Sequence, residues 1–156
     1  MEPHTTHLKK ALAFFKTADH LIYVTLPVVN DNKLIVTSLE NINLALQNGM
    51  NAVLEYERLY KRIMPLADNF NSRYEVFRKA VIGKYGFINE EALLILELKK
   101  FIEERKEAPM EFMRSNKYVI CSDNYKMKTV SISEIKKYLS STKNFLFKVS
   151  KVLKNA

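Results

Sequence analysis

The segment from residue 33 to residue 63 constrains the fold more than any other, because it contains no proline and repeats one apolar and small face at helical spacing. Residues that recur at steps of three or four lie along one side of an α-helix. The residues of this face are Leu34, Ser38, Ile42, Ala45, Gly49, Ala52, Tyr56 and Tyr60. A face rich in serine, alanine and glycine lets a second helix approach closely. The pattern therefore predicts a long helix in close contact with another one.

An earlier helix is predicted to begin near Thr5 or Thr6, either of which can cap it. It is predicted to end at Pro27, because proline disfavours helical geometry in the residue before it. A polar turn at residues 30–32 then supplies a capping side chain for the long helix. The short connection predicts that these two helices are antiparallel.

Three further helices have recognisable starts. Ser72 with Glu75 and Ser131 with Glu134 both have the spacing of a capping box. Asn89, followed directly by two glutamates, suits the positive end of a helix dipole. The helix that follows Asn89 is apolar around most of its circumference, which predicts a central position.

The composition favours helices over strands. The 156 residues include only three glycines and four prolines, which disfavours a turn-rich all-β architecture, and no linker divides the chain. We predict an all-α fold, an antiparallel helical bundle of five or six helices, in a single domain spanning residues 1–156. A short β-hairpin is predicted near residues 117–130, where β-prone segments flank a polar turn, and residues 110–114 are expected to add one helical turn.

The sequence shows no targeting or membrane segment of the usual kind. The amino-terminal residues lack a basic segment followed by an apolar core, and no run approaches the roughly 18 apolar residues of a membrane span. Cys121 is the single cysteine, which leaves no internal disulfide. We expect a cytoplasmic protein with no membrane partner, and the order of the first ten residues is left open.

No motif specifies a catalytic centre. The chain has no nucleophile elbow, no phosphate-binding glycine loop and no H-E-x-x-H pair. His4 and His7 have a spacing seen among metal ligands, but no third ligand stands near, and an exposed terminus is the more ordinary interpretation. We therefore predict no catalytic residues, no cofactor and no metal site. An enzymatic function would require a pocket in which several titratable side chains converge.

The positive charge lies in the last 40 residues, which contain nine lysines and only two acidic residues. Seven of these lysines form the predicted nucleic-acid-binding surface: Lys126, Lys128, Lys136, Lys137, Lys143, Lys148 and Lys151. Aromatic residues that could stack on bases are interleaved with them: Tyr118, Tyr125, Tyr138, Phe145 and Phe147. A lysine face also serves solubility, and several rings fit the buried face of the last helix equally well.

The long helix offers a second candidate surface. Its small and polar residues suggest a seam between helices or between subunits, and the predicted interface comprises Ser38, Asn41, Ala45, Asn48, Gly49 and Ala52. Glycine inside a helix costs about 1 kcal/mol relative to alanine, which suggests a close backbone contact at Gly49. The asparagines could instead form a polar flank that faces water.

The layout of two long antiparallel helices followed by shorter ones resembles the HEPN family of prokaryotic helical bundles. The tail from Arg114 to Ile120, followed by residues 131–139, is similar to the end of archaeal HEPN-like proteins. The resemblance implies a bundle that dimerises and associates with RNA, nucleotides or a partner nucleotidyltransferase. Active members cleave RNA with an arginine followed four to six residues later by histidine. Here no histidine follows His20 and no arginine precedes Arg58, so no cleavage is implied and Arg114 receives no catalytic role.

The sequence therefore predicts a non-enzymatic binding or assembly module that contacts RNA or nucleotides through its carboxy-terminal lysine face. The alternative is a homo-oligomeric structural or partner-binding protein that uses the small-residue seam without nucleic acid. An oligomer is expected in either case.

Overall fold

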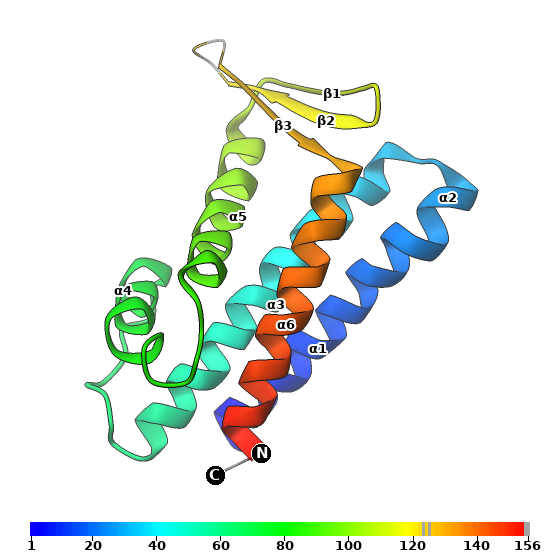
Figure 1. The fold of residues 1–156 in the computed structure, drawn as a ribbon. Helices are drawn as coiled ribbons and strands as arrows, with labels where there is room; N and C mark the ends of the chain where they lie inside the picture. Colours follow the sequence, from blue (N-terminus) through cyan, green and yellow to red (C-terminus); the bar gives the residue numbers. More distant parts are fainter. Residues whose placement is uncertain (123, 125, 155–156) are drawn as a thin grey trace.

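A computed structural model describes residues 1–122, 124 and 126–154, and most of them lie in helices (Figure 1). The elements follow in the order α1 (Pro3–His20), the π-helix η1 (Leu21–Thr25), α2 (Leu26–Val29), α3 (Asn32–Leu59), α4 (Phe70–Val76), the π-helix η2 (Phe77–Val81), α5 (Asn89–Glu107), β1 (Met110–Arg114), β2 (Lys117–Cys121), β3 (Met127–Ser131) and α6 (Ile132–Lys154). The predicted helical architecture is confirmed in outline. The chain is not an all-α bundle, however, because three antiparallel strands form a small sheet at one end.

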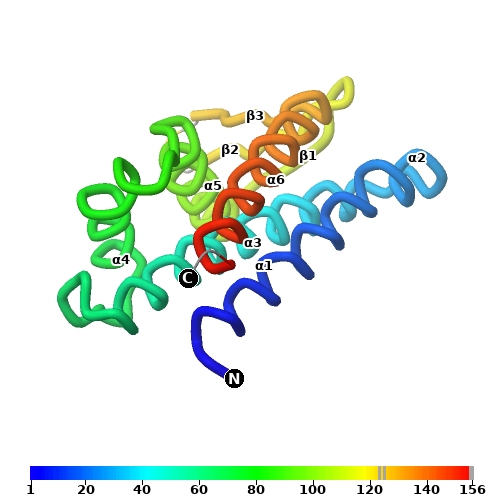
Figure 2. Tube along the Cα trace, turned by 60° about the horizontal axis from the view of Figure 1, so that its bottom comes forward, coloured from blue at the N-terminus to red at the C-terminus, as the bar shows by residue number. Residues whose placement is uncertain are grey.

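Helix α3 forms the centre of the molecule, and α1, α5 and α6 pack against it (Figures 1 and 2). Helix α6 approaches it closely at Gly49, where an added Cβ would lie 2.8 Å from side-chain atoms of both Phe145 and Leu146. The close helix contact predicted from the small-residue face is therefore present, and α6 makes it. Helix α5 lies further out than the sequence predicts, since its Leu93 is half exposed.

The first helix does not end at Pro27. The chain continues through η1 into α2, and the Leu26 N–H bonds the carbonyl of Leu21, a wider turn than that of an α-helix. A proline is tolerated here because the regular i→i−4 hydrogen-bond ladder is already interrupted. The helix ends instead at Asn30, whose φ of 54° is left-handed. Asparagine tolerates this conformation better than most residues.

The sheet has the strand order β1-β2-β3, with both pairs antiparallel. The hairpin predicted near residues 117–130 is confirmed as β2 and β3. Strand β1 replaces the helical turn expected at residues 110–114. The reason lies in Ser115 and Asn116, which both have positive φ, 48° and 64°. A two-residue hairpin turn of type I′ requires positive φ at both central positions, and this turn type suits the twist of the flanking strands.

The predicted starts of α3, α5 and α6 are confirmed to within a residue, whereas α1 begins at Pro3, before the predicted caps Thr5 and Thr6. Helix α5 begins at Asn89, and at the start of α6 the Glu134 N–H donates to Ser131 Oγ at 3.0 Å while the carboxylate of Glu134 accepts from Ser131. Helix α4 begins earlier than expected, because Asn69 caps it by accepting from the Ser72 N–H at 2.8 Å.

The continuous helix Pro3–Val29 is long and apolar enough to cross a bilayer, by length and composition alone. Its most apolar 18 residues have a mean hydropathy of 1.3, and only 17% of them are buried in the fold. This finding differs from the expectation that no such segment exists. Here the helix packs along α3 through a few small and apolar residues, among them Ala11, Ala18 and Ile22.

Candidate functional site

The seven predicted lysines differ in what surrounds them. Lys128 lies 2.7 Å from a carboxylate oxygen of Glu104, and Lys148 lies 3.0 Å from Oε1 of Glu91. The other five are exposed and form no ion pair within the described part of the chain: Lys126, Lys136, Lys137, Lys143 and Lys151. The solvent face of α6 is therefore basic, while two of the predicted cations are already partly neutralised.

The carboxy-terminal end of α6 forms one wall of a depression that we call the basic groove. Its other walls come from the end of α3 with the residues after it, and from the turn after η2. The lining residues are Tyr56, Arg62, Lys84, Tyr85, Gly86, Lys148, Lys151 and Val152. The volume is about 760 Å³, within the range of ligand sites. Four cationic side chains from three separate segments thus line one concave surface.

Buried Glu57 holds one side of the basic groove in place. Its carboxylate is 1% exposed and accepts hydrogen bonds from Lys84 at 2.8 Å, from Arg62 at 3.4 Å and from the hydroxyl of Tyr85. Burial alone would raise the pKa of Glu57, but the hydrogen bonds and charges of Lys84, Tyr85 and Arg62 outweigh it and lower that pKa. The hydrogen bond to Glu57 in turn raises the pKa of Lys84. Both groups therefore stay charged at neutral pH.

Buried Glu91 supports the opposite side. Its Oε1 accepts from Lys148 and also from the backbone N–H of Ile88, at 2.9 Å, just before α5 begins. Lys151 has no acidic partner in the part of the chain that the structure describes. The four cations of the basic groove thus face two carboxylates, Glu57 and Glu91, which leaves a surplus of two positive charges.

Aromatic rings lie beside the basic groove, although they differ from most of those predicted. Of the predicted rings, Tyr118 and Phe145 are buried, Tyr138 is half-buried, and Tyr125 falls outside the described residues. Phe147 is 64% exposed, and the Lys151 ammonium lies 5.2 Å from its ring centre. A second exposed ring, Tyr60, was not predicted for this site; the Arg62 guanidinium lies 5.0 Å from its centre. The sequence alone does not place Tyr60 beside α6, because this residue directly follows α3 and is distant from α6 along the chain.

The predicted interface on the long helix is largely covered by the chain itself. Its small residues, Ser38, Ala45, Gly49 and Ala52, are buried. At Gly49 this seam contacts α6 of the same chain, and at Asn48 it contacts His7 of α1. The two asparagines are half-buried: Asn41 donates to the carbonyl of Thr37, and Asn48 is hydrogen-bonded to His7 Nδ1 at 3.0 Å.

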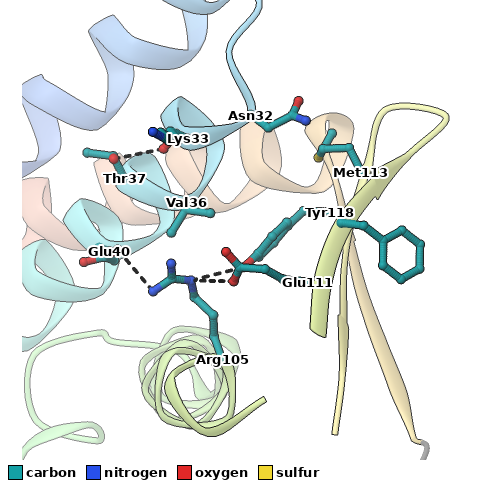
Figure 3. A pocket seen from close by; sticks show the side chains of 10 residues that line it. Asn32, Lys33, Val36, Thr37, Glu40, Arg105, Glu111, Met113 and Tyr118 are labelled. Atoms are coloured by element: carbon teal, nitrogen blue, oxygen red, sulfur yellow. Dashed lines mark hydrogen bonds and ion pairs between the residues drawn. The ribbon is translucent and has the colours of Figure 1, made fainter. Parts of the chain in front are cut away.

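A second pocket, of about 420 Å³, lies between the start of α3, the end of α5 and the sheet (Figure 3). Arg105 is its centre: it lies 3.7 Å from Glu40 and 3.2 Å from Glu111, and it donates to the hydroxyl of Tyr118 at 3.1 Å. Burial and the hydrogen bond to Glu111 raise the pKa of Tyr118 to about 12. The guanidinium satisfies two carboxylates within the fold, so this network ties the sheet to α3 and α5.

Within residues 1–122, 124 and 126–154, no three side chains of His, Cys, Asp or Glu are arranged as metal ligands. His7 bonds Asn48, and His4 lies edge-on against Tyr56 with ring centres 5.7 Å apart. Comparisons with family models, curated proteins and solved structures find no match to this chain.

Proposed function

We propose that this protein is a non-enzymatic module that binds single-stranded RNA, with the basic groove holding the phosphate backbone. One observation carries the proposal: four cationic side chains, Arg62, Lys84, Lys148 and Lys151, converge on one groove from three segments of the chain. The HEPN-like resemblance of the sequence agrees with a partner of this kind. The alternative, a homo-oligomeric module, would need a surface other than the small-residue seam, since the small residues of that seam are buried within the chain.

The chemistry of the groove suits a flexible strand with unpaired bases. Lysine and arginine attract phosphates without reading sequence. Tyr60 and Phe147 are exposed at its edges, and exposed rings stack on unpaired bases of any kind. A duplex keeps its bases paired and offers fewer such faces. The expected binding is therefore tolerant of sequence and prefers single strands.

The charge of the groove also predicts the salt dependence. Contacts between two and four phosphates release counterions, and the logarithm of the binding constant then falls against the logarithm of the salt concentration with a slope of roughly −1.4 to −2.8. A slope near zero would exclude phosphate contacts.

Two lysines on the same helix give a matched test. Lys151 lines the basic groove, whereas Lys137 is exposed near the other end of α6, about 21 Å away at 1.5 Å per residue. Neither lies in an ion pair among the described residues. Charge reversal at Lys137 changes the net charge by the same amount, but it acts from about 2.6 Debye lengths away at physiological salt.

The assay is fluorescence anisotropy with a labelled single-stranded RNA of mixed sequence, titrated with wild type, Lys151→Glu and Lys137→Glu. We expect Lys151→Glu to weaken binding about tenfold or more, corresponding to roughly 1.4 kcal/mol, and Lys137→Glu to weaken it far less. Equal effects of the two variants would show a diffuse attraction to the whole basic face. No binding by the wild type would overturn the proposal itself.

A further inference from the structure

The opposite end of the molecule carries an exposed apolar surface that we call the apolar tip. It consists of the outward side chains of η1 and α2: Tyr23, Val24, Pro27, Val28 and Val29. Val28 is 84% exposed and Val29 is 58% exposed. Scattered exposed apolar residues are common, but a contiguous group marks a contact surface.

The fold does not cover the apolar tip from within. In this part of the helix, Ile22 and Leu26 are buried and Leu21 and Thr25 are partly buried, whereas the residues of the apolar tip are exposed. Within the described residues, α2 packs mainly against η1, which directly precedes it. Figures 1 and 2 both show α2 standing out at one end of the molecule.

Cations surround this surface. The Lys136 ammonium lies 5.2 Å from the ring centre of Tyr23. Lys33 lies in the first turn of α3, shortly after α2. In Figure 1 the turn between β1 and β2 lies at the same end of the fold, and Arg114 and Lys117 are the strand residues on either side of that turn. The one exposed acid in the connection, Asp31, is engaged as the cap of α3, where it accepts from a backbone N–H at 3.0 Å.

We propose that the apolar tip inserts into the interface of an anionic lipid bilayer while these cations contact the headgroups. An apolar helical surface flanked by lysines is the arrangement of interfacial membrane helices, and a tyrosine favours the headgroup level. Each lysine near an anionic leaflet adds attraction, so stable binding needs both the valines and the charges.

The same charges argue against a second copy of the chain as the partner. A two-fold interface would place identical patches face to face. Lys136 and its neighbours would then oppose their own copies, and like charges across an interface are unfavourable. An anionic bilayer has the opposite charge and therefore fits this surface better.

Membrane contact leaves the basic groove free. The apolar tip precedes the first residue of α3, and the groove lies at the last turn of α3, which has 28 residues. At 1.5 Å per residue the two surfaces are about 40 Å apart. Membrane binding and RNA binding therefore use different ends of the protein, and a variant can lose one of these interactions and keep the other.

The test uses vesicles of phosphatidylcholine alone and of equimolar phosphatidylcholine and phosphatidylserine. We expect the full chain to co-sediment with the anionic vesicles only. The double variant Val28→Asp/Val29→Asp should lower the partition coefficient by roughly tenfold or more, because both inserted side chains become charged. The single variants Val28→Asp and Leu93→Asp form the matched pair, because each adds one negative charge at an exposed apolar side chain, Val28 in the apolar tip and Leu93 on α5. Val28→Asp should weaken partitioning, whereas Leu93→Asp should partition like the wild type.

A fluorescent reporter checks insertion directly, because the chain contains no tryptophan. Val28→Trp should shift its emission to shorter wavelength on anionic vesicles, whereas Leu93→Trp should not. Wild-type protein that fails to partition, or aspartates that leave partitioning unchanged, would overturn the proposal. A wild type that dimerises without lipid, and an aspartate variant that is monomeric, would assign the apolar tip to self-association instead.

Discussion

Replacing Glu57 with glutamine is the sharpest test of the groove's architecture. The carboxylate accepts hydrogen bonds from Lys84, Arg62 and Tyr85, and it is 1% exposed. A glutamine keeps one acceptor oxygen, but its amide group turns a donor toward other donors. Hydrogen bonds to a charged group contribute about 1.5–3 kcal/mol each.

The expected loss is smaller than two such bonds together, because the Lys84 and Arg62 side chains are about 40% exposed and water can replace part of the interaction. We expect Glu57→Gln to lower the free energy of unfolding by about 2 kcal/mol. For a domain of this length, that corresponds to a Tm lower by roughly 4–8 °C. Urea denaturation at pH 7, followed by circular dichroism, measures the difference.

The pH dependence separates this mechanism from simple misfit of the amide. The folded pKa of Glu57 lies below its ordinary value of 4.5, so its contribution is fully present above 4.5 and is lost as pH falls through the folded pKa. The wild type and the variant should therefore become equal in stability toward acid pH. A difference that stays constant down to pH 3 would refute the electrostatic reasoning. Glu75→Gln is the control, because the Glu75–Arg78 pair is exposed and its loss should be too small to resolve.

Two further changes test the core and the sheet. Gly49→Ala gains about 1 kcal/mol of helix propensity, but its Cβ would press on Phe145 and Leu146, and overpacking costs about 1–3 kcal/mol, so a net loss of roughly 1 kcal/mol is expected in thermal or urea unfolding. A variant more stable than the wild type would show that α6 can shift away from α3 at little cost in free energy. Tyr118→Phe should reduce the alkaline sensitivity of the fold. The wild type should lose stability relative to the variant as pH rises from 10 toward 12, because the folded pKa of Tyr118, about 12, exceeds the unfolded value. Parallel stability curves over that range would contradict the burial of the hydroxyl.

Much of the fold follows from local sequence signals. The small-residue face of α3 predicts a close helix contact, and the Ser131–Glu134 box predicts the start of α6. The predictions of helix ends and turns fail where the surrounding backbone conformation overrides a rule based on a single residue. Pro27 does not stop a helix that has already widened into a π turn, and the turn at Ser115 and Asn116 depends on backbone angles that composition does not show.

The candidate site was predictable only in part. The charge count locates the basic helix, and Lys148 and Lys151 belong to the basic groove. The remaining cations, Arg62 and Lys84, come from segments far away along the chain, so only the fold brings them there. The sequence also does not show whether Gly49 contacts a helix of the same chain or of a second subunit, because both kinds of contact use the same small-residue face.

The buried glutamates explain why the groove, rather than the whole lysine face, is the stronger candidate for binding. Stability alone does not explain a buried, ion-paired carboxylate, because apolar residues of similar size often stabilise a core equally well. Glu57 and Glu91 have a second consequence: they hold Lys84, Arg62 and Lys148 in fixed positions at the wall of a cavity. Side chains that are ordered before binding lose less conformational entropy when a ligand arrives. Among the described residues, the exposed lysines at the other end of α6 pair with no buried carboxylate, so a ligand would have to order more of each side chain itself.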